Sequence, residues 1–153
     1  MLDVSNLIAL GSLFAALLAA VYAKSTVRTA NKANEIAIHN ERLKIYRGFV
    51  SFHSALNSQG VGINDKDLWA VFEHVELSEF YYSAQLYEDF QRYFSLAREI
   101  RARKDLWSTI EEESGTQARV AYVKETHEIY KRCLDLGKQL DQEFRSKLRV
   151  WKT

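Results

Sequence analysis

The hydrophobic pattern of the chain begins with twenty residues that carry no charge. Residues 4–23 read VSNLIALGSLFAALLAAVYA, and twenty helical residues at ~1.5 Å per residue cover the ~30 Å hydrocarbon layer of a membrane. Asp3 precedes this segment, whereas Lys24, Arg28 and Lys32 follow it within nine residues. Because Lys and Arg concentrate on the cytoplasmic side, we expect a single-pass transmembrane helix with its N-terminus outside and the rest of the chain in the cytosol.

Two other interpretations of residues 4–23 stay open. A cleaved signal peptide would have Val21 and Ala23 near its cleavage site, but such peptides begin with basic residues and this chain begins MLD. A buried helix of a soluble protein would also be rich in alanine. The length and the basic flank favour the membrane, so we expect residues 1–23 to form an anchor in a bacterial inner membrane.

Small side chains lie along one side of this predicted anchor helix. Two neighbouring rows have a four-residue spacing, Gly11, Ala15 and Ala19 in one and Ser12, Ala16 and Ala20 in the other. Such rows let the backbone of another helix approach closely inside a membrane, although alanine is also common simply because it favours helices. We expect these rows to pack against another helix, most simply the same helix of a second copy in a homo-oligomer.

The helical pattern continues beyond the apolar segment. The chain contains no proline, and residues 24–57 contain one glycine, so we expect one helix from Asp3 to Asn57 with residues 24–44 as its juxtamembrane part. Apolar residues recur near its far end with the 4-3-4 spacing of one helical face. They are Ile45, Phe49, Phe52 and Leu56.

Two breaks divide the remainder, residues 45–153, which we expect to form a cytosolic antiparallel helical bundle. NSQGVGIN at 57–64 and SGT at 114–116 have the glycines and polar residues of turns. Helices are expected at 65–75, 84–113 and 117–152, and the short turn makes the last two antiparallel. Their apolar positions are Leu68, Trp69, Val71, Phe72 and Val75; then Leu86, Phe90, Tyr93, Ala97, Ile100 and Trp107; then Val120, Val123, His127, Tyr130, Leu134, Gly137, Phe144, Leu148 and Trp151.

Composition strengthens the all-α prediction. Zero prolines and six glycines among 153 residues are too few for the turns of a β-sandwich or a doubly wound fold. The single cysteine, Cys133, has no partner for a disulfide within the chain. The 21 basic and 20 acidic residues give a net charge of +1, so we expect no duplex nucleic acid as a partner.

The charges are segregated along the chain. Residues 64–91 hold seven acidic residues and one lysine, and residues 92–104 hold five basic residues and one glutamate. Such blocks are typical of solvated faces or interhelical ion pairs. They also permit an anion-binding site shared between subunits, because arginine forks suit phosphates and aromatic rings stack on bases. The candidate ligand-binding residues are Arg92, Arg98, Arg101, Arg103, Lys104, Arg119, Tyr122 and Lys124.

The chain offers no constellation for catalysis. Its four histidines lack metal-ligand spacing with one another or with Cys133, and no HExxH, CxxC or phosphate-loop motif occurs. His127 lies on an apolar row, where we expect it to be a core residue. We therefore expect a protein that is not an enzyme and that holds no metal or cofactor.

Three segments carry a resemblance to a known group of proteins. They are RTANKANEIAIHNERLKIYRGF at 28–49, SEFYYSAQLYEDFQRYFSLA at 78–97 and EFRSKLRVW at 143–151. They resemble parts of small single-pass bacterial membrane proteins of unassigned function. The layout of the whole chain, an anchor followed by a helical cytosolic domain, also resembles the small membrane effectors of type III CRISPR antiviral systems, which respond to cyclic oligoadenylate. The resemblance implies an oligomer with an elongated helical cytosolic domain, and it assigns no residue as a ligand contact.

These observations lead to two functional expectations. The first is a non-enzymatic inner-membrane effector or sensor, whose cytosolic domain binds an anionic, cyclic-nucleotide-like ligand and perturbs the membrane lipid in bacterial antiviral defence. The alternative is a static single-pass anchor or scaffold that recruits a cytosolic protein partner.

Overall fold

All regular secondary structure in the residues that the structure describes is helical. This structure, a computed structural model, describes residues 3–113 and 116–149. Four α-helices and one short 3-10 turn account for this part of the chain, and it contains no strand. The all-α prediction is therefore confirmed. The chain divides into two compact units, one through His39 and one from Asn40 onward.

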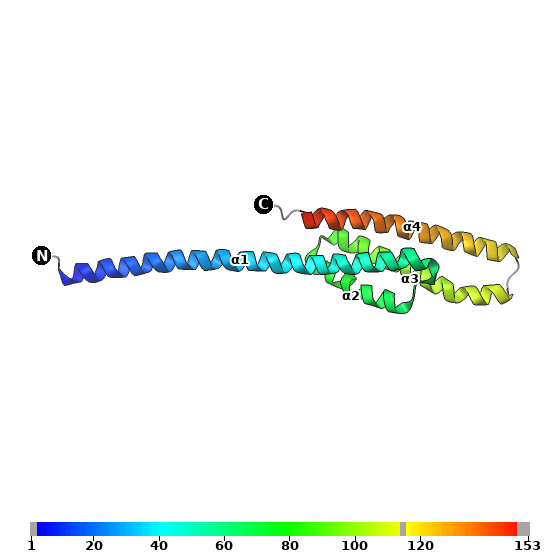
Figure 1. Cartoon of the computed structure of the whole chain (residues 1–153), viewed down its shortest axis with the longest axis horizontal. Helices are drawn as coiled ribbons and strands as arrows, with labels where there is room; N and C mark the ends of the chain where they lie inside the picture. Colours follow the sequence, from blue (N-terminus) through cyan, green and yellow to red (C-terminus); the bar gives the residue numbers. More distant parts are fainter. Residues whose placement is uncertain (1–2, 114–115, 150–153) are drawn as a thin grey trace. The chain divides into compact units, whose positions relative to one another are not determined.

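Helix α1 spans Val4–Gln59, so the expected helix from Asp3 to Asn57 forms as one element (Figure 1). By length and composition, it is the one helix of the described residues that could cross a membrane, and its apolar window contains no buried residue. Exposed large side chains there include Leu10, Phe14 and Leu17. In water these residues would cost free energy, since apolar surface prefers to leave water.

The far end of α1 contributes to the core of the unit that starts at Asn40. Ile45, Phe49 and Leu56 are fully buried and Phe52 nearly so, as their spacing predicts. The Phe49 ring lies 5.7 Å from that of Phe90 and 5.2 Å from that of Phe144. The α1 helix gives way to the 3-10 turn Gly60–Gly62, where Gly60 has a φ of +58° that side chains rarely tolerate.

Helix α2, Asp65–Tyr81, starts directly after the predicted break at 57–64 and continues six residues beyond the expected end at 75. The Asn64 side chain accepts a hydrogen bond from the Asp67 amide at 2.9 Å, which caps the helix. Of the expected apolar set, Leu68, Val71 and Val75 are buried. The two aromatic residues of that set, Trp69 and Phe72, are exposed.

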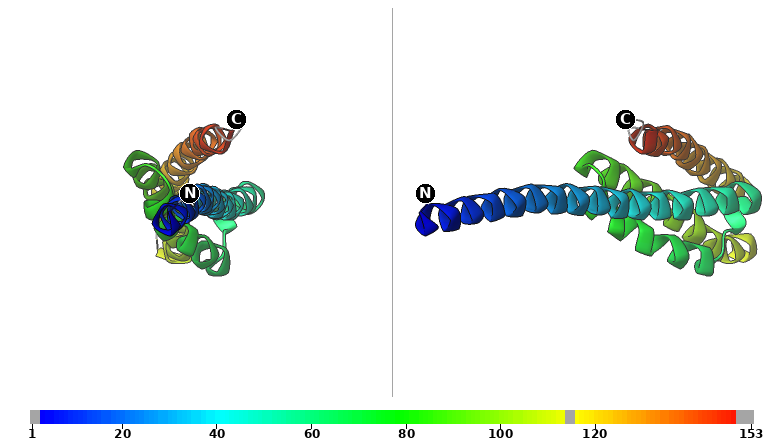
Figure 2. Two further views of the ribbon diagram at one scale, coloured as in Figure 1. Left: turned by 90° about the vertical axis from the view of Figure 1, so that its left-hand side faces the viewer. Right: turned by 60° about the vertical axis from the view of Figure 1, so that its left-hand side comes forward.

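Helix α3, Ala84–Glu113, packs against both α2 and α4, Thr116–Arg149 (Figures 1 and 2). Its predicted row from Leu86 to Ile100 is fully buried. Contacts with α2 pair Asp65 with Arg101 and Phe72 with Phe94, so α2 and α3 run in opposite directions. The contacts with α4 also run in opposite order, pairing Arg103 with Glu125 and the Tyr93 carbonyl with Cys133. It follows that α2 and α4 run in the same direction.

The predicted apolar row of α4 is wrong over its first turns. Val120 and Val123 are 63% and 53% exposed, and His127 is exposed rather than a core residue. Gly137 and Phe144 of the predicted row are buried. The other buried residues of α4 lie beside that row and were not predicted: Ile129, Cys133 and Leu140. The reason for the exposed first turns is the length of α1, which ends near the level of Tyr130, whose hydroxyl donates to the Leu56 carbonyl at 3.3 Å. The first turns of α4 therefore have α3 but not α1 beside them. Trp151 lies outside the described residues.

Candidate functional site

A cleft opens between the distal ends of α3 and α4. Its volume is about 320 Å³, and most of its walls are apolar or aromatic. The rings of Trp107 and Tyr122 stack across it with centroids 6.1 Å apart and 29° between their planes. The cleft is lined by Val61, Arg103, Lys104, Trp107, Tyr122, Val123, Thr126, His127 and Tyr130. Of the predicted ligand residues, the structure thus brings Arg103, Lys104 and Tyr122 together.

Arg103 is held in place by carboxylates. Its guanidinium lies 2.9 Å from a Glu125 carboxylate oxygen and 3.7 Å from one of Glu99. The same group stacks on the Tyr122 ring at 5.2 Å, and the Tyr122 hydroxyl donates to the Arg103 carbonyl at 2.7 Å. Its hydrogen bond with Arg103 lowers the pKa of Glu125, so the carboxylate stays ionised and offsets the charge of the arginine.

A second, shallower hollow continues from the cleft along α4. It measures about 510 Å³ and shares Trp107, Val123 and His127 with the cleft. The predicted ligand residues Arg119 and Lys124 line it. In the cleft, the Lys104 ammonium donates to the Gly62 carbonyl at 3.5 Å. Cations therefore line both the cleft and the hollow that continues from it.

Two other predicted ligand residues lie on a different side of α3. Arg98 and Arg101 line a hollow of about 230 Å³ that faces α2. Arg101 forms an ion pair with Asp65 at 3.1 Å and another with Asp105. Arg92 is exposed nearer the start of α3 and lines neither hollow. Because 101 and 103 are two residues apart, they point to nearly opposite sides of one helix, and the predicted set cannot form one site within a single chain.

The small-residue rows of α1 have no neighbour in the single chain described. Nothing lies within 4 Å of the position that a Cβ at Gly11 would occupy, and all six residues of the two rows are exposed. Ser12 donates to the Ile8 carbonyl at 2.9 Å, as a hydroxyl in an apolar helix commonly does. Packing of these rows against another helix stays a prediction.

Two histidines fill spaces that glycines leave. The His53 ring lies over Gly137, and its Nδ1 is hydrogen-bonded to the Tyr93 hydroxyl at 2.9 Å. The His74 ring lies over Gly48. Burial lowers the pKa of both imidazoles, which keeps them neutral near pH 7. No group of three potential metal ligands occurs in the described part of the chain.

Sequence reasoning missed the parts of the cleft that come from elsewhere in the chain. Val61 reaches the cleft from the 3-10 turn, and Tyr130 reaches it from the next turns of α4. Glu125, the partner of Arg103, was also missed. The one available signal was that the predicted antiparallel arrangement places the start of α4 beside the basic segment of α3. No protein-family model matches the chain, and no curated protein or solved structure is similar to it.

Proposed function

We propose that the protein is a non-enzymatic effector or sensor of a bacterial inner membrane. In this proposal residues 1–23 are the anchor, with the N-terminus outside, and residues 45–153 form a cytosolic antiparallel helical bundle. The bundle binds an anionic ligand with an aromatic base, of the cyclic oligoadenylate class. Binding alters the assembly of homo-oligomers and so perturbs the membrane, which is the action expected of an antiviral effector.

The observation that supports this proposal is the cleft between α3 and α4. The Trp107 ring, which stacks on Tyr122, offers a flat apolar face on which a base can stack, and such stacking contributes ~1–3 kcal/mol per base. Lys104 lines the cleft and Lys124 lines the hollow that continues from it. Because Arg103 is already paired with carboxylates, we assign the phosphates to Lys104 and Lys124.

Binding is tested with the full-length chain in a mild detergent. Cyclic tri-, tetra- and hexaadenylate are titrated while tryptophan fluorescence and the melting temperature are measured, with AMP as a reference. We expect quenching and a higher melting temperature, because a ligand that binds the folded state stabilises it. Lys104→Glu with Lys124→Glu is expected to weaken binding about tenfold or more, since each lost charge-assisted contact contributes ~1.5–3 kcal/mol.

The matched control is Arg92→Glu, which changes the charge of α3 outside the cleft. It is expected to leave the affinity for the oligoadenylate unchanged. A chain whose fluorescence and melting temperature do not respond to any of the three cyclic oligonucleotides contradicts the ligand part of the proposal. Equal weakening by the control and by the lysine variant contradicts the placement of the site.

The membrane part is tested separately. We expect the chain to stay with membranes after alkaline carbonate extraction, and a protease added outside intact spheroplasts to leave residues 45–153 uncut. Release of dye from liposomes that hold the protein, on addition of the ligand that binds, tests the effect on the membrane. Extraction of the chain by carbonate would rule out the anchor.

The alternative function is a static anchor or scaffold for a cytosolic protein. The ion pairs of Arg101 with Asp65 and of Arg103 with Glu125 favour it, because they leave fewer cations for a phosphate-rich ligand. A scaffold predicts no response to cyclic oligonucleotides and a single stoichiometric partner that co-purifies with the chain in detergent.

A further inference from the structure

The outer side of α2 carries an exposed aromatic and acidic face. Trp69 and Phe80 are 65% and 78% exposed, and Phe72 is 38% exposed. Glu73 and Glu76 lie between these aromatic residues and are also exposed. The spacing 69, 72, 73, 76, 80 places all five on one side of the helix. We call these five residues the α2 face.

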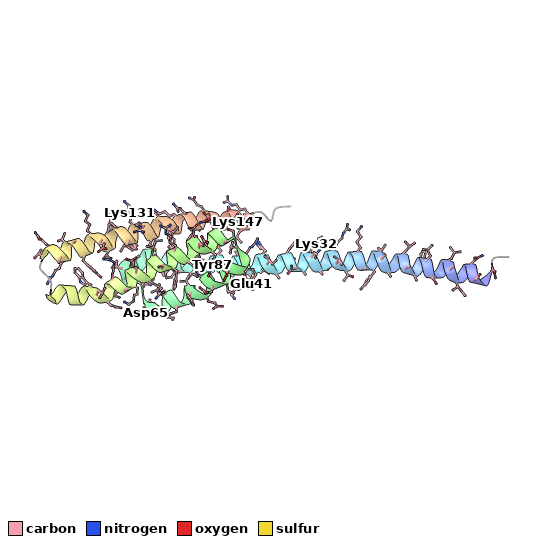
Figure 3. All side chains as sticks on the ribbon, turned by 180° about the vertical axis from the view of Figure 1, so that it is seen from behind. Lys32, Glu41, Asp65, Tyr87, Lys131 and Lys147 are labelled. Atoms are coloured by element: carbon pink, nitrogen blue, oxygen red, sulfur yellow. The ribbon has the colours of Figure 1, made fainter. Side chains whose placement is uncertain are left out.

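The outer side of α4 carries an exposed aliphatic and basic face. It consists of Val120, Val123, Lys124, His127 and Lys131, all of them exposed. Figure 3 shows Lys131 on the side of α4 that is turned away from α3. The spacing of this α4 face is identical to that of the α2 face, with 51 residues between corresponding positions. Two helices laid parallel in this register bring corresponding residues to the same level.

In that register each level pairs compatible side chains. Trp69 would meet Val120 and Phe72 would meet Val123, which buries apolar surface from both helices. Below them, Glu73 would meet Lys124.

The two lower levels continue the match. Glu76 would meet His127, and the Lys131 ammonium would lie over the Phe80 ring, an arrangement in which a cation is attracted to the aromatic face. All five levels thus pair residues that attract one another.

We propose that the α2 face of one copy of this protein docks on the α4 face of a second copy. The contact does not form within one chain, because α2 and α4 pack against α3 rather than against each other. Val123, Lys124 and His127 of the α4 face also line the cleft and the hollow beside it, so docking would cover part of that surface. Two α2 faces would place carboxylates against carboxylates, and two α4 faces would place lysines against lysines. Charge therefore selects a contact between unlike faces.

A contact between unlike faces continues from copy to copy. After two copies have docked, the pair still has one free α2 face and one free α4 face. Further copies can therefore add, and rings or open chains form rather than closed pairs. The contact needs neither the ligand nor the packing of the membrane helices, and it stands even if the proposed function fails.

The test is a charge exchange in the full-length chain in mild detergent, with the mass of the assembly measured by light scattering over a range of concentrations. We expect wild-type chains to form assemblies larger than two copies. Glu73→Lys, or Lys124→Glu, is expected to weaken self-association about tenfold, because each change places like charges at the same level. A mixture of the two variants is expected to recover it, because the exchanged charges at positions 73 and 124 attract each other again.

Cysteine cross-linking tests the register. An equimolar mixture of Glu76→Cys and His127→Cys chains is expected to form a disulfide dimer under mild oxidation, whereas either variant alone gives much less. Cys133 is fully buried and does not interfere.

The control for the charge exchange is Glu88→Lys with Arg92→Glu, which alters exposed charges of α3 outside both faces.

The proposal is overturned if wild-type chains are monomeric at all concentrations, or if both charge-reversed variants assemble as well as the wild type. It is also overturned if the mixture of reversed variants does not recover assembly while each variant keeps the circular dichroism of the wild type. If a charge-reversed variant fails to fold, the cysteine cross-linking decides the question. A yield of disulfide dimer from either cysteine variant alone that equals the yield from the mixture contradicts a contact between unlike faces.

Discussion

Gly137 should be intolerant of a single added methyl group. A Cβ at this position of α4 would lie 2.4 Å from Cε1 and 2.5 Å from Nδ1 of His53, and 3.0 Å from Cε2 of Tyr93. Contacts below 3.0 Å force one group to move. The Tyr93 ring is fully buried, so His53, which borders a solvent-exposed cleft between α1 and α4, is the side chain that must rotate away.

The cost of Gly137→Ala follows from what His53 leaves behind. Its Nδ1 would lose the 2.9 Å hydrogen bond with the Tyr93 hydroxyl, and a buried polar group without a partner costs ~1–3 kcal/mol. The residual 3.0 Å contact with Tyr93 adds about 1 kcal/mol of overpacking. Alanine in place of glycine within a helix stabilises the folded state by about 1 kcal/mol. We expect the free energy of unfolding to fall by about 1–3 kcal/mol.

A double-mutant cycle separates this contact from a general intolerance of α4. Urea denaturation followed by circular dichroism gives the free energy of unfolding for the wild type, Gly137→Ala, His53→Ala and the double variant. In the His53→Ala background the imidazole is gone, so Gly137→Ala should be neutral or stabilise by up to about 1 kcal/mol. Gly62→Ala, where no atom lies within 4 Å of the new Cβ, serves as the control. An equal loss from Gly137→Ala in both backgrounds would refute the reasoning.

Four further predictions concern the same unit. Phe49→Ala removes a fully buried ring and should lower the free energy of unfolding by about 3–5 kcal/mol in the same denaturation experiment. Asn64→Ala removes the cap of α2 and should cost about 1 kcal/mol, whereas Asn64→Asp should retain most of it. Burial raises the pKa of the Cys133 thiol to about 12, so it should react with a thiol reagent only after the chain is unfolded in urea. Burial also lowers the pKa of His53 in the folded state, so the unfolded chain binds more protons than the folded chain below pH ~6.5. The melting temperature should therefore fall as the pH drops through that value. This fall should be smaller in His53→Ala.

The helices could be predicted from sequence because their core faces are periodic and local. Leu86 to Ile100 in α3 and Ile45 to Leu56 in α1 are buried as their spacing requires, and the glycine at position 60 ends α1 where a positive φ is needed. The buried side of α4 was harder to predict over its first turns. The predicted row contains the buried Gly137 and Phe144 but also the exposed Val120 and Val123. Whether the first turns are covered depends on where α1 ends, and this is decided by packing between distant segments.

The predicted anion site failed as a single cluster for a related reason. A basic run such as RARK at 101–104 points in several directions once it is helical, because each residue turns the side chain by ~100°. Arg101 consequently meets Asp65 of α2, whereas Arg103 meets Glu125 of α4. These acids come from segments 36 residues before Arg101 and 22 residues after Arg103, so the spacing within the basic run gives no sign of them. Part of the basic block therefore holds α3 between its two neighbours, whereas Lys104 of the same block lines the cleft.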